Sequence, residues 1–103
     1  MKDLNILAVC AHGEILETIV RLVNGHPGWR AVGATDTEQT IRMLEASEYD
    51  IILLGSGLDA ESEVNLAGMC RKLRPQMKIV YHFGGGSGLL ANEILGALAA
   101  DNA

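Results

Sequence analysis

Three residues near the ends of apolar segments have side chains that could perform chemistry. Cys10 ends the first apolar run, His12 lies two positions further on, and His82 lies near the end of a later run. Thiolate and imidazole groups are good ligands for zinc and copper, so these side chains would form a metal site if they met. Their spacing matches no recognised metal motif, and a histidine near a loop is more often hydrogen-bonded or solvated. We therefore expect no metal and no cofactor, and keep this cluster as an open alternative.

A glycine-rich loop, 84–88, could in principle bind phosphate, because free backbone amides before a helix attract anions. The loop lacks the Lys-Ser/Thr pair of a P-loop and does not follow the first strand, as a dinucleotide-binding loop would. We expect it to be a flexible connection.

Length and composition limit the class of protein. The 103 residues have room for one domain, 1–103, and the 49% hydrophobic and 20% charged content is typical of a globular chain. A net charge of -5 has the wrong sign for a nucleic-acid binder. The apolar run 4–11 is far shorter than the roughly 18 residues of a membrane span. With two cysteines and no signal peptide, we expect reduced thiols in a cytoplasmic protein.

The elements that must position these residues alternate regularly along the chain. Short apolar runs typical of buried strands occupy 4–10, 29–34, 49–54 and 78–83, and each is followed by residues at helical spacing. Strict alternation implies right-handed crossovers and a parallel sheet with helices on both faces. The sequence therefore predicts a flavodoxin-like α/β fold, three layers thick, with a four-stranded parallel sheet in the order 2-1-3-4.

Helical spacing also predicts which side chains face the sheet. The expected inward residues of the first, third and fourth helices are Ile15, Leu16, Ile19, Val20, Leu22 and Val23; Leu66, Met69, Cys70 and Leu73; and Leu90, Ile94, Leu95 and Leu98. The second helix is expected to begin with a capping box formed by Thr35, Asp36 and Glu38 or Gln39. Trp29, which opens the second strand, is expected to pack on the rim of the sheet, with a contact surface as the alternative.

Ligands of such sheets gather at the carboxyl ends of the strands, which brings together residues 10–13, 55–59 and 82–87. Arranged in this way, the whole chain resembles the receiver domains of two-component response regulators. The segment 6–13, Ile-Leu-Ala-Val-Cys-Ala-His-Gly, is similar to that family's first strand and its Asp-Asp-His-Pro corner. Segment 49–54, Tyr-Asp-Ile-Ile-Leu-Leu, resembles the strand that presents the phosphorylated aspartate, and segment 70–80 resembles the third helix and fourth strand.

The residues that carry the family's chemistry are replaced. Cys10 and Ala11 stand where the resemblance implies a carboxylate pair for Mg²⁺, a cation that demands oxygen ligands. Gly55 stands at the phospho-accepting aspartate, and His82 and Phe83 at the switch Thr or Ser. No lysine on a fifth strand follows, and we expect a domain truncated after its fourth strand-helix unit. The resemblance thus implies a degenerate receiver that is not an enzyme and acts in bacterial signalling by protein contact, independently of phosphorylation.

Cys10 also allows an alternative reading. A cysteine after the first strand resembles the sugar-phosphotransferase B components, whose cysteine carries a phosphoryl group. Glu14 and Glu17, in the helix that follows, would repel a phosphate there.

The last expectation concerns self-association. In the order 2-1-3-4 the fourth strand has one neighbour, and the run from Ile79 to Phe83 has no proline or charge that would blunt its open edge. We expect a homodimer formed through this strand or through the last helix, although the same edge would also suit another signalling protein. The candidate interface residues are Ile79, Tyr81, Phe83, Leu89 and Leu98.

Overall fold

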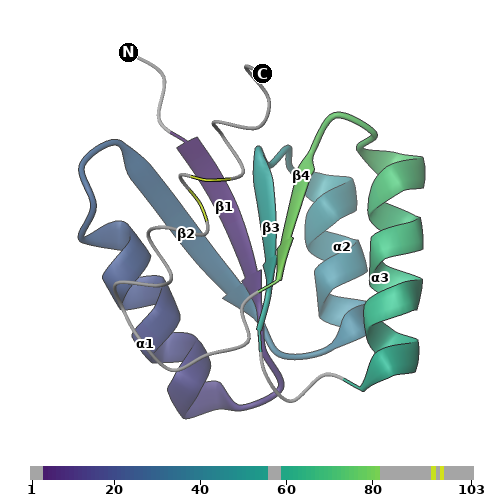
Figure 1. Ribbon diagram of the computed structural model, residues 1–103, viewed down its shortest axis with the longest axis horizontal. Helices are drawn as coiled ribbons and strands as arrows, with labels where there is room; N and C mark the ends of the chain where they lie inside the picture. Colours follow the sequence, from purple (N-terminus) through teal and green to yellow (C-terminus); the bar gives the residue numbers. More distant parts are fainter. Residues whose placement is uncertain (1–3, 56–58, 82–93, 95, 97–103) are drawn as a thin grey trace.

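A computed structural model describes residues 4–55, 59–81, 94 and 96 of the chain. Their elements follow the expected alternation: β1 (Leu4–Val9), α1 (Gly13–Asn24), β2 (Trp29–Ala34), α2 (Thr37–Ala46), β3 (Ile51–Leu54), α3 (Ala60–Leu73) and β4 (Lys78–Tyr81). The strands form one parallel sheet in the order β2-β1-β3-β4, which confirms the predicted fold and strand order (Figure 1). The helices cover both faces, α1 on one side and α2 with α3 on the other.

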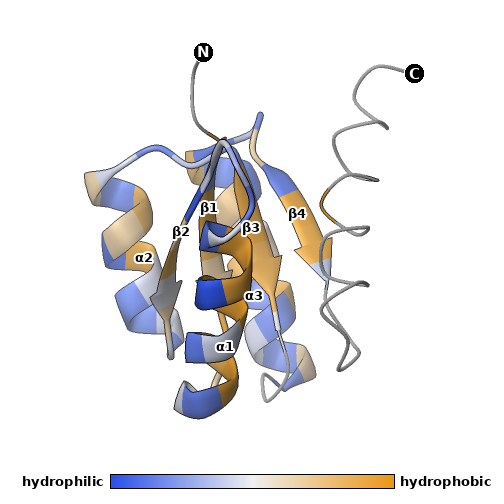
Figure 2. Cartoon of the chain, turned by 90° about the vertical axis from the view of Figure 1, so that its left-hand side faces the viewer, coloured by the Kyte–Doolittle hydropathy of each residue, from blue (hydrophilic) through white to orange (hydrophobic). Residues whose placement is uncertain are grey.

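The core has two halves because neighbouring residues of a strand point to opposite faces. On the α1 side, the buried residues include Ile6, Ala8 and Cys10 of the first strand segment. On the α2–α3 side, Leu7 and Val9 meet Leu44 and Leu66. In Figure 2 the hydrophobic colour lies mainly on the strands and on the sides of the helices that face them. The two central strands are thus covered above and below.

The buried side of α1 is narrower than the sequence predicted. Leu16, Ile19 and Val23 are buried as expected, but Ile15 and Leu22 are 44% and 41% exposed. These two lie seven positions apart, on the flank of the helix and not on the side that faces the sheet. The prediction that they face the core was wrong.

The other helices agree better with expectation. On α3, Leu66 and Cys70 are buried, while Met69 and Leu73 are half-buried. Of the last predicted helix, the structure describes only residues 94 and 96, both helical. Ile94 is fully buried and belongs to the cluster on the α1 side of the sheet, as predicted. Leu90, Leu95 and Leu98 lie outside the described residues.

Local interactions explain where the elements begin. The Asp36 carboxylate caps α2 by accepting from the Gln39 backbone N–H at 2.7 Å. The Gln39 side-chain oxygen in turn accepts from the Thr35 backbone N–H at 3.0 Å, so the expected capping box is present.

The third strand begins at Ile51, two residues later than predicted. The reason is Asp50, whose carboxylate accepts from the Asn5 amide at 2.8 Å while its own amide donates to the Asn5 carbonyl at 2.8 Å. Asp50 therefore ties β1 to β3 instead of continuing a strand.

Candidate functional site

The carboxyl ends of β1 and β3 bring Cys10 and Gly55 side by side. The Gly55 amide donates to the Val9 carbonyl at 2.7 Å, and the Cys10 amide donates to the Ala34 carbonyl at 3.1 Å. A Cβ atom on residue 55 would lie 3.3 Å from the Cys10 Cβ and 3.2 Å from the Val9 carbonyl oxygen. The position that resembles the receiver's phospho-acceptor is therefore both without a side chain and tightly enclosed.

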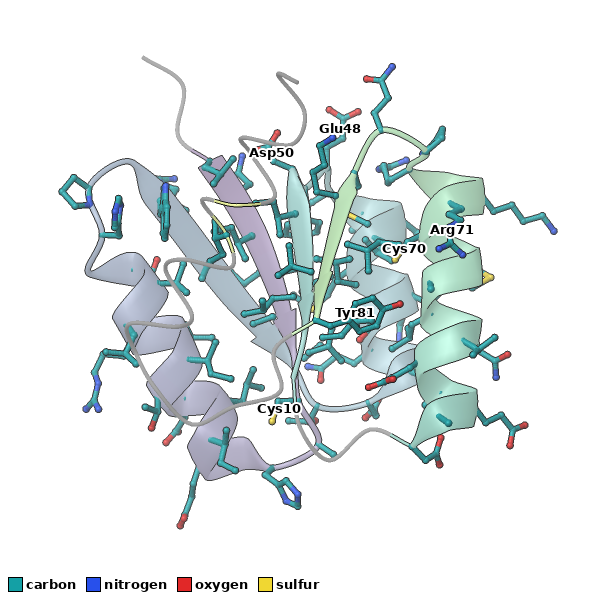
Figure 3. All side chains as sticks on the ribbon, viewed as in Figure 1. Cys10, Glu48, Asp50, Cys70, Arg71 and Tyr81 are labelled. Atoms are coloured by element: carbon teal, nitrogen blue, oxygen red, sulfur yellow. The ribbon has the colours of Figure 1, made fainter. Side chains whose placement is uncertain are left out.

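Cys10 points into the core and not into the crevice at the strand ends. Its side chain is fully buried in the α1-side cluster, and its thiol lies 3.6 Å from the His12 carbonyl oxygen, to which it donates a weak hydrogen bond. Figure 3 shows it between the sheet and α1. A phosphoryl donor would have to displace apolar neighbours to reach this sulfur, which disfavours the phosphocarrier alternative.

The polar side chains near this end of the sheet are exposed to solvent or cap a helix. Ala11 and His12 are exposed, as are Glu14 and Glu17 on α1. Asp59 caps α3, and its carboxylate accepts from the Ser62 amide at 2.7 Å. That backbone hydrogen bond, helped by the Ser62 hydroxyl, holds the pKa of Asp59 below its usual range. The Asp59 carboxylate thus serves the start of α3.

The alternative to the expected absence of metal was a site formed by Cys10, His12 and His82. Within the described ranges, no group of three His, Cys, Asp or Glu side chains could hold a metal ion. His82, the third proposed ligand, lies outside them, together with Phe83, the loop 84–88, Leu89 and Leu98. These members of the predicted site and interface stay predictions.

The amino ends of the strands form a second polar region at the opposite end of the sheet. The loops before β3 and β4 enclose an open hollow of about 670 Å³, whose charged lining residues are Glu48, Asp50, Arg74 and Lys78. Figure 3 shows Glu48 and Asp50 at the end of the sheet that lies away from Cys10. Asp50 organises this end, because its carbonyl also accepts from the Lys78 amide at 3.0 Å and so links β3 to β4. We assign it a structural role.

Arg74 joins the two helices on the far face of the sheet. Its guanidinium donates to the Leu44 carbonyl at 2.9 Å and to the Leu73 carbonyl at 3.0 Å. A cation next to the last carbonyls of α2 also complements the negative end of that helix. These contacts give Arg74 a structural role.

The β2 edge of the sheet is occupied by side chains and turn groups that the sequence analysis missed. The Asn24 amide accepts from the Ala31 N–H at 2.9 Å and donates to the Ala31 carbonyl at 3.1 Å, as a neighbouring strand would do. The next outward N–H, from Trp29, donates to the His26 carbonyl at 3.2 Å. An asparagine before a glycine is typical of a helix end, so the hydrogen bonds of Asn24 to β2 have no local signal in the sequence.

Trp29 packs on the rim of the sheet. Its ring stacks on the His26 imidazole, with centroids 3.6 Å apart and planes 15° apart, and it contacts the α1-side core. Gly28, with a φ of 82°, makes the turn that allows this stacking, since few other residues adopt that conformation. The packing supports the rim role over a free contact surface.

Comparison with known proteins identifies the fold. No protein-family model matches the sequence, and no curated protein matches it either. Among solved structures, the receiver domain of the hybrid histidine kinase CckA has a TM-score of 0.78 at 16% identity, covering 91% of this chain and 98% of that one. A CheY-like receiver protein from Methanospirillum hungatei JF-1 gives 0.71 at 22%, covering 93% and 76%.

A third similar structure carries a bound ligand. The response regulator TrrA from Thermotoga maritima, solved in complex with Mg²⁺-BeF, gives a TM-score of 0.68 at 22% identity and covers 87% of this chain and 81% of that one. These likenesses show that the chain has the receiver fold. As for membranes, no helix within the described ranges is long and apolar enough to span one.

Proposed function

We propose that this chain is a receiver-fold signalling domain that works by contact with other proteins and neither accepts a phosphoryl group nor catalyses a reaction. The observation that carries this proposal is Gly55. The position that resembles the phospho-acceptor has no side chain, and the space a Cβ would need is bounded by the Val9 carbonyl and Cys10. An acyl phosphate needs a carboxylate, and none is provided there.

The surroundings of Gly55 support the same conclusion. Cys10 and Ala11 offer no carboxylate oxygens for Mg²⁺, and the Asp59 carboxylate is engaged at the start of α3. Without a metal site and an acceptor, the domain would hold one signalling state. We propose that it acts in the cytoplasm, that its partners are a second copy of the chain and another signalling protein, and that it contacts neither nucleic acid nor membrane.

The test is phosphoryl transfer measured by intact mass. The chain is incubated with acetyl phosphate and Mg²⁺, and in parallel with a phosphohistidine donor, beside a receiver that retains its aspartate as a positive control. We expect the mass of this chain to stay unchanged while that of the control rises by one phosphoryl group. A phosphoryl group mapped to Cys10 would establish the phosphocarrier alternative, and one mapped elsewhere would overturn phosphorylation independence.

A further inference from the structure

The two edges of the sheet differ in their backbone hydrogen bonding. In a parallel ladder, alternate residues turn their N–H and C=O groups to opposite sides. On β2, Arg30, Val32 and Ala34 face β1, because the β1 amides pair with the carbonyls of Gly28 and Ala34. Ala31 faces outward, and the Asn24 side chain satisfies both of its groups. A strand added at this edge would have to displace Asn24.

The β4 edge carries no such side chain among the described residues. Lys78 donates its N–H to the Asp50 carbonyl, so Lys78 and Val80 face β3 and Ile79 faces away from it. Within the described ranges, β4 pairs with β3 alone. Ile79 therefore presents one outward donor and one outward acceptor at the middle of the strand.

An outward residue at the middle of the strand suits a twofold partner. In an antiparallel pair, two directly opposed residues exchange both N–H···O bonds. If the axis passes between Ile79 and its copy, the outward N–H and C=O of both Ile79 residues are satisfied at once. The outward backbone of this residue is therefore complementary to itself.

Charge on α3 favours the same arrangement. The first turn of α3 carries Glu61 and Glu63, and its last turn carries Arg71 and Lys72. The helix lies on the β4 side of the molecule, outside α2 (Figure 1). A twofold axis normal to the sheet keeps both copies of α3 on one face and runs them antiparallel, so the acidic end of each approaches the basic end of the other.

From these features we infer that two copies of this chain join across their β4 edges, antiparallel about a twofold axis at Ile79, with their α3 helices on one face and their charged ends matched. The inference rests on the proposed function, because it names the second copy as the partner of a contact domain. Its interface is isologous, so each residue that contributes does so twice.

The backbone contact is tested with Ile79→Pro. Proline removes the outward N–H but no bond to β3, because Ile79 does not donate in that ladder. We expect sedimentation equilibrium at about 100 μM to give twice the 11.0 kDa chain mass for the wild type and a single chain for Ile79→Pro. Ile79→Val, which keeps the N–H, should remain a dimer, and circular dichroism should show all three folded. A monomeric wild type, or a dimer that survives Ile79→Pro, overturns the inference.

A second pair of variants tests the charge match without touching the strand. One variant carries Glu61→Lys and Glu63→Lys, which makes both ends of α3 basic, and the other carries Arg71→Glu and Lys72→Glu, which makes both ends acidic. We expect each alone to dimerise at least ten-fold more weakly than wild type, and an equal mixture to form the heterodimer by native mass spectrometry. Glu14→Lys with Glu17→Lys on α1 makes the same charge change as the basic variant and should leave the dimer intact.

The two proposals fail separately. An unphosphorylated chain that is monomeric at 100 μM, or whose charge variants do not recombine, refutes the twofold contact and leaves the contact domain with a different partner. A phosphorylated chain refutes phosphorylation independence whatever its mass in solution.

Discussion

Raising the pH should destabilise this protein through Cys70. The Cys70 thiol is 1% exposed on the inner side of α3, and burial raises its pKa from the usual 9.0 to about 11, against a smaller lowering by the Arg71 charge. A thiol whose pKa is higher in the folded state ionises first in the unfolded chain. Its contribution to stability is therefore complete below pH 9 and is lost as the pH rises toward 11.

The size of the effect follows from the two pKa values. At pH 10 the unfolded thiol is about nine-tenths ionised and the folded one about one-tenth. The free energy of unfolding should then fall by about 1.4 kcal/mol relative to pH 8, because one pKa unit corresponds to about 1.36 kcal/mol. The full loss, above pH 11, approaches about 3 kcal/mol for the two units between 9.0 and about 11.

The assay compares urea unfolding of the wild type and Cys70→Ala at pH 8, 9 and 10 in the presence of a phosphine reductant. The Ala variant is less stable at every pH because it leaves a cavity, but that loss does not depend on pH. We expect the stability difference between the two proteins to shrink by about 1.4 kcal/mol from pH 8 to pH 10. Equal pH slopes for both proteins would refute the assignment of the raised pKa to a buried thiol.

Further substitutions at Gly55, Asn24, His26 and Trp29 test other contacts. Gly55→Asp should lower the free energy of unfolding by at least about 1 kcal/mol more than Gly55→Ala, because its carboxylate is placed in a buried position. A denaturant titration measures this difference. Acetyl phosphate with Mg²⁺ should still leave the Asp variant unlabelled. Asn24→Ala should cost about 1–2 kcal/mol, since two hydrogen bonds to the β2 edge are lost, and an unchanged urea midpoint would contradict that role. His26→Ala should expose the Trp29 ring and shift its fluorescence emission to longer wavelength. Trp29→Ala should lower the melting temperature. Weaker partner binding by this variant at an unchanged melting temperature would instead favour a contact surface.

The strand order could be predicted from sequence because it depends on rules that hold for the whole class of fold. Alternating runs imply right-handed crossovers, and the aliphatic run 51–54 identifies a central strand. The approach of Cys10 to Gly55 then follows, since both come directly after neighbouring strands. Ile94 was placed correctly by helical spacing alone.

Features that depend on tertiary neighbours could not be predicted in this way. The exposure of Ile15 and Leu22 depends on how much of α1 the sheet covers, and periodicity does not measure that width. The pairing of Asn24 with Ala31 depends on the turn at Gly28, whose positive φ returns the chain beside the helix end. The sequence predicted that Asp50 extends the third strand. Its actual role could not be predicted, because its hydrogen bond to Asn5 joins residues 45 positions apart.

The Asn24 side chain also has a consequence for the number of chains in an assembly. A sheet with two open edges can add a copy at each of them, and repeated addition leads to filaments and aggregation. At the β2 edge the Asn24 amide already occupies the place of a next strand. In the proposed dimer, strand pairing would therefore add one copy at β4 and then stop. One asparagine at the end of a helix would thus set an upper limit of two on strand-paired assembly, and its loss would be expected to appear first as turbidity in concentrated solution.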